Sequence, residues 1–124
     1  MAEHGFFYWN ELITGDVAKA KDFYGKTLGW TFEDMPMPAG GSYTMIKLGD
    51  KMVGGMLPKT AEMGEMPDHW FTYVAVDDVD KRVATVAAAG GKVMRDPFDV
   101  PGVGRIGVVV DATGAAQGWM TSAN

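Results

Sequence analysis

Apolar and polar residues follow the same order twice along the 124-residue chain. In the first half, residues 6–13 are aromatic and β-branched, which predicts a strand. Apolar residues then recur at helical spacing between Asp16, placed to cap a helix, and Gly29, placed to end it. The apolar stripe of this helix is Val17, Ala20, Phe23, Tyr24 and Leu28. Three further strands are predicted at residues 30–33, 43–48 and 52–57.

The second half repeats this order when the sequence is shifted by about 62 residues, which places Asp16 on Asp78. Residues 70–76 predict a strand, and Asp77 or Asp78 is placed to cap a helix that ends at Gly90 and Gly91. One face of that helix carries Val79, Val83, Val86 and Ala87. Strands follow at residues 92–95, 105–110 and 115–120, with a loop at 96–104 and a turn at 111–114.

Residues 58–68 carry two prolines and four charges, which is typical of a linker. The chain therefore reads as one domain, residues 1–124, made of two modules at residues 1–57 and 69–124. Its length agrees with a single domain.

Charge and composition exclude several classes of protein. The formal net charge is −5 and basic residues do not cluster, which disfavours a nucleic-acid partner. There is no cysteine, so disulfides and thiolate chemistry are excluded. No apolar run reaches the length of a membrane span, and the first residues do not resemble a signal peptide. We therefore expect a cytoplasmic protein with neither nucleic acid nor membrane as partner.

Four segments carry a resemblance to a known family: ELITGDVAKAKDFYGKTLGWTFE (11–33), VAVDDVDK (74–81), AAAGGKV (87–93) and GVGRIGVVVDATGA (102–115). Together with the doubled order of elements, they resemble the vicinal oxygen chelate superfamily of glyoxalase I, bleomycin-resistance proteins and extradiol dioxygenases. The resemblance implies an α+β fold, in which two tandem βαβββ modules form a curved mixed sheet around an open, ligand-holding cup. It also implies a homodimer.

Enzymes of this superfamily usually bind a divalent metal through His, Gln or Glu from the first and last strand of each module. The matching positions here are Trp9, Phe71, Gly118 and a fourth-strand residue, about Met56, or Gly55 if the strand is shifted by one. None of these side chains is a ligand for such a cation. We therefore predict neither a metal site nor a cofactor. The two histidines, His4 and His69, are interpreted as surface or rim residues.

The predicted inner face of the cup is aromatic, because Phe7, Trp9, Phe71 and Tyr73 share it. Such a lining suits a flat or apolar ligand. The alternative is that these side chains pack on one another and fill the cup. The candidate ligand-binding residues are Phe7, Trp9, Tyr43, Met56, His69, Phe71, Tyr73, Arg105, Gly118 and Met120. Trp30, Trp70 and Trp119 are interpreted as core or dimer contacts.

Two charged residues carry candidate chemistry. Glu11 shares strand parity with Trp9, and a carboxylate among aromatic rings is expected to have its pKa raised toward the range of a general base. Glu11 is therefore the candidate catalytic residue, with a purely structural glutamate as the alternative. Arg105 either binds an anionic group of a ligand or pairs with a neighbouring acidic side chain.

Four functions remain open from the sequence. The favoured hypothesis is a metal-independent, glyoxalase/bleomycin-resistance-like protein that binds a small apolar or aromatic molecule. The second is a metal-free lyase or isomerase that uses Glu11, with Tyr43, Tyr73 or Arg105 polarising the substrate. A divalent-metal lyase or dioxygenase and a scaffold with a filled cup are the remaining alternatives.

Overall fold

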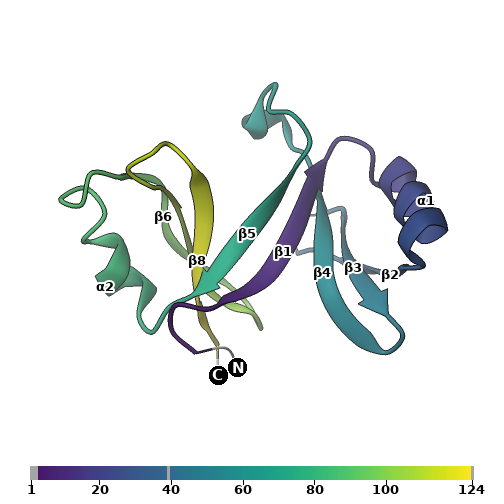
Figure 1. Cartoon of the computed structure of the whole chain (residues 1–124), viewed down its shortest axis with the longest axis horizontal. Coiled ribbons are helices and arrows are strands. Elements are labelled where there is room, and N and C mark those ends of the chain that lie inside the picture. Colours follow the sequence, from purple (N-terminus) through teal and green to yellow (C-terminus); the bar gives the residue numbers. More distant parts are fainter. Residues whose placement is uncertain (1–2, 39, 124) are drawn as a thin grey trace. The chain divides into compact units, whose positions relative to one another are not determined.

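The structure, a computed structural model, describes residues 3–38 and 40–123. Strand, helix and three strands occur twice (Figure 1), which confirms the predicted α+β class and its βαβββ order. The first series is β1 (Phe7–Thr14), α1 (Val17–Leu28), β2 (Thr31–Pro36), β3 (Ser42–Leu48) and β4 (Lys51–Pro58), followed by a short 3₁₀ helix, η1 (Ala61–Met63). The second is β5 (His69–Ala75), α2 (Val79–Val83), β6 (Lys92–Val100), β7 (Gly104–Val110) and β8 (Ala116–Ser122).

The chain forms two compact units. The first unit is Asn10–Trp70, and the second unit comprises the residues before Asn10 and those from Phe71 onward. In the first unit the strand order is β2-β3-β4-β1, and β1 runs parallel to β4. In the second unit the order is β5-β8-β7-β6, and β5 runs parallel to β8. Each unit therefore has one parallel strand pair beside an antiparallel set.

Aspartate caps begin both helices, as predicted. The side chain of Asp16 accepts a hydrogen bond from the backbone N–H of Lys19 at 2.9 Å. Asp78, rather than Asp77, does the same for Lys81 at 3.2 Å. These contacts satisfy N–H groups that have no partner within the helix. Gly29 ends α1 in the left-handed conformation, at φ 73°, where glycine carries no steric cost.

The core of the first unit lies between α1 and its sheet. Leu12, Ile46 and Met56 are buried against a surrounding group of Val17, Ala20, Tyr24, Trp30 and Phe32. The predicted helix stripe is wrong at Phe23 and Leu28, which are 57% and 54% exposed. Phe23 lies at the edge of the stripe, and Leu28 is the last helical residue. The apolar stripe is therefore narrower than predicted.

The core of the second unit packs α2 against its sheet through Val79, Val83, Val86 and Val109, with Val76, Val93 and Trp119 around them. The regular helix ends at Val83, and Ala87 is exposed, contrary to the prediction. Beyond Val83 the backbone tightens into bonds between residues three apart, such as Val86 N–H to Val83 carbonyl at 3.1 Å. The helical face is thus continued by turns.

Strand β6 is longer than predicted, because residues 96–100 belong to it rather than to a loop. The pairing of β6 with β7 shifts between Val93 and Arg95 and again between Arg95 and Phe98. These irregularities carry the strand through Pro97, which lacks an N–H group and is tolerated on an edge strand.

The predicted linker lies wholly in the first unit and is tied to the end of β1. Asp68 accepts hydrogen bonds from the Thr14 hydroxyl at 2.6 Å and the Gly15 N–H at 3.2 Å. The Lys59 ammonium lies 2.7 Å from the same carboxylate. These hydrogen bonds lower the pKa of Asp68 to about 2, and the bond from Lys59 has the larger effect, followed by that from Thr14. Among the described residues, no helix has the length and apolar character needed to cross a membrane.

Tyr8 of β1 carries a polar atom that the fold leaves unsatisfied. Its hydroxyl oxygen is buried and has no hydrogen-bond partner in the described part of the chain. Burial raises the pKa of Tyr8 from 10.0 to about 12. The folded state therefore retains the phenol proton at a pH where the unfolded chain has lost it.

Replacing Tyr8 with phenylalanine tests this arrangement. Between about pH 10 and pH 12 the unfolded wild-type chain binds fewer protons than the folded one, so stability falls as pH rises. Tyr8→Phe should lack that contribution and, at pH 8, match or exceed wild-type stability by up to about 1 kcal/mol. Urea unfolding at pH 8 and pH 11 measures both effects.

Tyr24→Phe is the matched control, because the Tyr24 hydroxyl accepts a hydrogen bond from the Trp70 indole at 3.2 Å. This variant should lose stability at pH 8. A Tyr8→Phe protein that is less stable than wild type at pH 8 would contradict the assignment of an unpartnered hydroxyl.

Candidate ligand-binding faces

The residues predicted to line a cup divide between the two units, and each unit has a face of its own. In the first unit, Leu12 and Met56 pair across β1 and β4 and pack on the α1 side. Glu11 and Gly55, the preceding pair, therefore point to the opposite side of the sheet. Met45 pairs with Gly55, so it and Tyr43 share that side. We call this side the helix-free face of the first unit.

The fourth-strand position predicted at Met56 is wrong by one residue. Met56 is fully buried toward α1, and Gly55 occupies the place on the helix-free face. The error comes from a change in the offset between the two halves. Glu11 and Tyr73 are 62 residues apart, whereas their strand partners Gly55 and Gly118 are 63 apart. A constant shift of 62 therefore slips by one residue before the last strand.

The second unit has a corresponding helix-free face. Trp119 packs toward α2, and the neighbouring pairs Tyr73–Gly118 and Ala75–Met120 point to the other side. Phe71 lies in phase with Tyr73, and their rings meet edge to face with centroids 5.3 Å apart at 80°. Phe71, Tyr73, Gly118 and Met120 therefore share one face, as predicted. Phe7, which is 67% exposed, and the partly buried Trp9 belong to the same unit.

A tyrosine lies against a glycine on each helix-free face. A Cβ atom added to Gly55 would collide with the hydroxyl end of Tyr43. A Cβ atom added to Gly118 would collide with the ring of Tyr73 and lie 3.1 Å from Phe71 Cε2. Each ring thus occupies the space that a side chain at the glycine would need.

Glu11 is the buried carboxylate of the first unit, with 6% of its surface exposed. Its strand partner is Gly55, over which the Tyr43 hydroxyl lies. Neighbouring strands are separated by about 4.8 Å. Glu11 and the Tyr43 hydroxyl therefore both lie next to Gly55 on the helix-free face.

His69 begins β5 and belongs to the first unit. Its Nδ1 atom lies 2.8 Å from the Pro67 carbonyl oxygen, so Nδ1–H is the donor of this hydrogen bond. This contact holds the His69 ring beside the segment that leads into β5.

Arg105 does not share a face with Tyr73 and Gly118. Its strand partner Thr121 accepts a hydrogen bond from the Val79 N–H at the start of α2, so Arg105 lies on the helix side. The guanidinium donates to Asp80 at 2.7 and 3.1 Å and lies 3.2 Å from Asp99. These carboxylates raise the pKa of Arg105, and Arg105 lowers that of Asp80. The alternative in which Arg105 pairs with acidic side chains is therefore the one observed.

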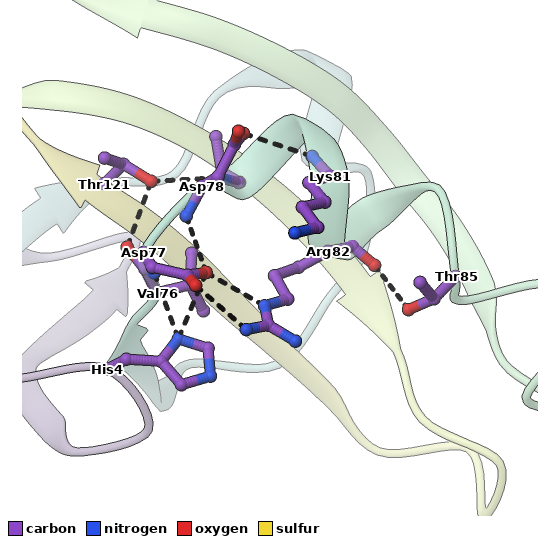
Figure 2. Close-up of polar contacts among 9 residues, drawn as sticks. His4, Val76, Asp77, Asp78, Lys81, Arg82, Thr85 and Thr121 are labelled. Atoms are coloured by element: carbon purple, nitrogen blue, oxygen red, sulfur yellow. Dashed lines mark hydrogen bonds and ion pairs between the residues drawn. The ribbon is translucent and has the colours of Figure 1, made fainter.

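A groove of about 530 Å³ lies on this helix side of the second unit, lined by residues 77–80, 99–102, 104–105 and 121–123. Sequence reasoning did not identify it, because the acidic run at 77–80 was explained by helix capping. Figure 2 shows the polar contacts of three of its lining residues, Asp77, Asp78 and Thr121. The Asp77 carboxylate accepts two hydrogen bonds from the Arg82 guanidinium, both at 2.9 Å. The backbone N–H of Asp77 donates a hydrogen bond to His4 Nδ1 at 3.0 Å. The Arg82 guanidinium holds the pKa of Asp77 well below its usual range.

The side chains at the four ligand positions that the family resemblance implies do not fit a metal ion. At the positions that the family resemblance implies for ligands stand Trp9, Gly55, Phe71 and Gly118, none of which offers a donor side chain. Tyrosine rings fill the space beside both glycines. Across residues 3–38 and 40–123, no three His, Asp or Glu side chains are grouped so that they could hold a metal.

Comparison with known proteins identifies the class. Residues 7–116 match the family model of the Glyoxalase/Bleomycin resistance protein/Dioxygenase superfamily, and the chain belongs to this superfamily. The predicted family resemblance is therefore confirmed.

Two curated relatives are more specific. The chain is 43% identical over 113 residues to the Mycobacterium tuberculosis protein named "Putative glyoxylase CFP32", which covers 91% of this chain and 42% of that protein. It is 36% identical over 121 residues to "Anthracycline biosynthesis protein DnrV" of Streptomyces peucetius, covering 87% of this chain and 44% of that protein. The chain thus spans less than half the length of these relatives.

Solved structures share the fold. A methylmalonyl-CoA epimerase in complex with methylmalonyl-CoA and NH₄⁺ has a TM-score of 0.69 at 19% identity, covering 98% of this chain and 96% of that one. A hypothetical protein of Bacillus halodurans has a TM-score of 0.71 at 12% identity, covering 98% and 97%. At these identities the likeness concerns architecture alone.

Proposed function

We propose that this protein binds a flat aromatic small molecule through its helix-free faces, without a metal ion or other cofactor. The observation that carries the proposal is the second unit's face, where Phe71 and Tyr73 meet edge to face beside Gly118 and Met120. Aromatic rings favour stacked and edge-to-face contacts with other rings. Methionine adapts its shape to an irregular apolar partner.

The relatives give this ligand class further support. One of them, 36% identical to this chain, is named for anthracycline biosynthesis. Anthracyclines are fused, flat aromatic rings that carry hydroxyl and carbonyl oxygens. Such a molecule offers ring faces to Phe71 and Tyr73 and oxygen atoms to phenol hydroxyls.

The remaining partners belong to the same proposal. We place the protein in the cytoplasm as a homodimer, in which Phe23 and Leu28, exposed on α1, are apolar surface that a second copy would cover. The net charge of −5 disfavours a polyanionic partner such as nucleic acid.

Titration with the anthracycline doxorubicin, followed by its fluorescence, tests ligand binding. Wild-type protein should bind, and Tyr73→Ala should weaken binding by about 2- to 13-fold, the equivalent of one aromatic pair at roughly 0.5–1.5 kcal/mol. Phe23→Ala removes an exposed ring from α1 and should leave the affinity unchanged. The proposal fails if wild-type protein does not bind, or if both variants lose affinity equally.

Metal content tests the second half of the proposal. After equilibrium dialysis against Mn²⁺, Fe²⁺, Ni²⁺ and Zn²⁺, elemental analysis should find far less than one ion per chain, because no donor side chains stand at the ligand positions. Doxorubicin binding should be the same with and without a chelator. About one tightly held ion per chain would overturn metal independence.

One observation favours a second candidate, a metal-free lyase or isomerase. Glu11 is buried, and its strand partner Gly55 lies against the Tyr43 hydroxyl on the first unit's helix-free face. In such an arrangement the carboxylate accepts a proton from a carbon next to a carbonyl group and then returns it. The phenol hydroxyl donates a hydrogen bond to the carbonyl oxygen, where negative charge develops.

Proton exchange into an aromatic ketone, 1-indanone, distinguishes the two candidates. An enzyme of this type accelerates exchange of the protons beside the carbonyl with deuterium, measured by nuclear magnetic resonance. Glu11→Gln should lower that rate by about 10²- to 10⁴-fold while leaving doxorubicin affinity unchanged. Absence of any acceleration by the wild-type protein would remove the enzymatic candidate and leave the binding protein.

A further inference from the structure

We infer that Gly55 and Gly118 are positioning residues that make room for Tyr43 and Tyr73, and that these tyrosines occupy the places where other superfamily members carry metal ligands. We call Tyr43 with Gly55, and Tyr73 with Gly118, the glycine–tyrosine pairs. The inference deepens the proposed function and rests on it for the ligand used below. It assigns the phenol rings as the contacts that select an oxygen-bearing aromatic ligand.

Backbone conformation does not explain glycine at either position. Ten glycines of the described chain have positive φ angles, and neither Gly55 nor Gly118 is among them. Both lie within regular strands, β4 and β8, where any residue adopts the extended backbone. What a side chain would meet therefore decides why glycine stands there.

In the first unit, the three atoms nearest to a Cβ atom on Gly55 all belong to the far end of the Tyr43 side chain. Gly54, the preceding residue, differs, because its Cβ atom would lie 2.7 Å from the backbone oxygen of Asn10. Gly91 likewise faces the carbonyl oxygen of Val110 at 2.6 Å. Gly54 and Gly91 serve backbone packing, whereas Gly55 serves one aromatic side chain.

In the second unit a tyrosine also lies against a glycine, but it comes from a different strand of the βαβββ series. Tyr73 lies on β5 and is the direct strand partner of Gly118 on β8. Tyr43 lies on β3, two residues before Met45, which is the β3 partner of Gly55. The Tyr43 side chain extends along the face to Gly55 on β4. By the 62-residue offset, the counterpart of Tyr73 in the first unit is Glu11, which is not a tyrosine. The two pairs therefore do not follow from one repeated sequence motif. Each unit separately places a tyrosine ring on its glycine.

This arrangement has a chemical consequence. A ligand-type side chain at position 55 or 118, such as glutamate or histidine, and the tyrosine ring compete for one space. With glycine present, each ring is held against a strand, so that little side-chain freedom is lost when a ligand binds. The phenol hydroxyls then select a flat ring that carries hydroxyl or carbonyl oxygens over a plain hydrocarbon.

Double-mutant cycles with doxorubicin test whether each glycine acts through its tyrosine. Gly118→Ala should weaken binding by about 2- to 13-fold in the wild-type background, because the added methyl group displaces the ring. In a Tyr73→Ala background the same substitution should cause no further loss. Gly55→Ala should behave in the same way toward Tyr43→Ala. Urea unfolding of every variant separates affinity from stability.

Gly54→Ala is the matched control, because its methyl group meets backbone rather than a tyrosine. It should lower stability whether or not Tyr43 is present. The inference is overturned if Gly55→Ala and Gly118→Ala leave affinity unchanged, or lower it equally when the tyrosines are absent.

A ligand-free measurement separates this inference from the proposed function. Nuclear Overhauser contacts should join the Gly55 Hα protons to the Tyr43 ring and the Gly118 Hα protons to the Tyr73 ring. Each contact should disappear in the corresponding alanine variant. If wild-type protein shows these contacts but does not bind doxorubicin, the pairs stand and the proposed ligand class fails. Absence of the contacts in wild type overturns the pairs themselves.

Discussion

The register of the parallel strand pairs, β1 with β4 and β5 with β8, decides which side of the sheet each candidate residue occupies. Side chains alternate along a strand, so a shift of one residue moves every side chain to the opposite face. Glu11 and Gly55 face away from α1 only because Leu12 and Met56 pair toward it. The same alternation sends Trp119 into the α2 core and Gly118 to the helix-free face. Core packing therefore determines the composition of the candidate site.

The two sides of the second unit's sheet use different interactions. On the α2 side, Arg105, Asp80 and Asp99 form ion pairs, and Asp77 pairs with Arg82. Surface ion pairs of this kind contribute little stability each, but they leave these side chains engaged with one another. The helix-free face of this unit carries Phe71, Tyr73 and Met120 instead. Ring packing and apolar surface rather than charge therefore characterise this face.

Local sequence signals were sufficient for much of this fold. Asp16 and Asp78 cap helices because short polar side chains satisfy free N–H groups, and that rule needs no tertiary information. Strand parity correctly grouped Phe71 with Tyr73 and Gly118. The prediction failed where distant segments decide the outcome. The offset between the halves grows from 62 to 63 residues before β8, so a constant offset selects Met56 instead of Gly55. Ion pairs with Asp80 and Asp99 hold the Arg105 side chain, and hydrophobic periodicity does not predict such pairs. The bulges that carry β6 past Pro97 are equally invisible in the hydrophobic pattern.

Proteins of one superfamily share a fold, so their chemistry differs through the side chains at a few positions of the sheet. Sequence relatives of this chain are named for a glyoxylase and for anthracycline biosynthesis, and a methylmalonyl-CoA epimerase shares its fold. A shared backbone supplies strand positions whose side chains point to one face of the sheet. The identity of those side chains decides what such a fold binds. Here glycine at 55 and 118 gives that space to tyrosine rings. Because a tyrosine ring and a side chain at the glycine position cannot occupy one space, glycine at 55 and at 118 is what allows each ring to lie against its strand.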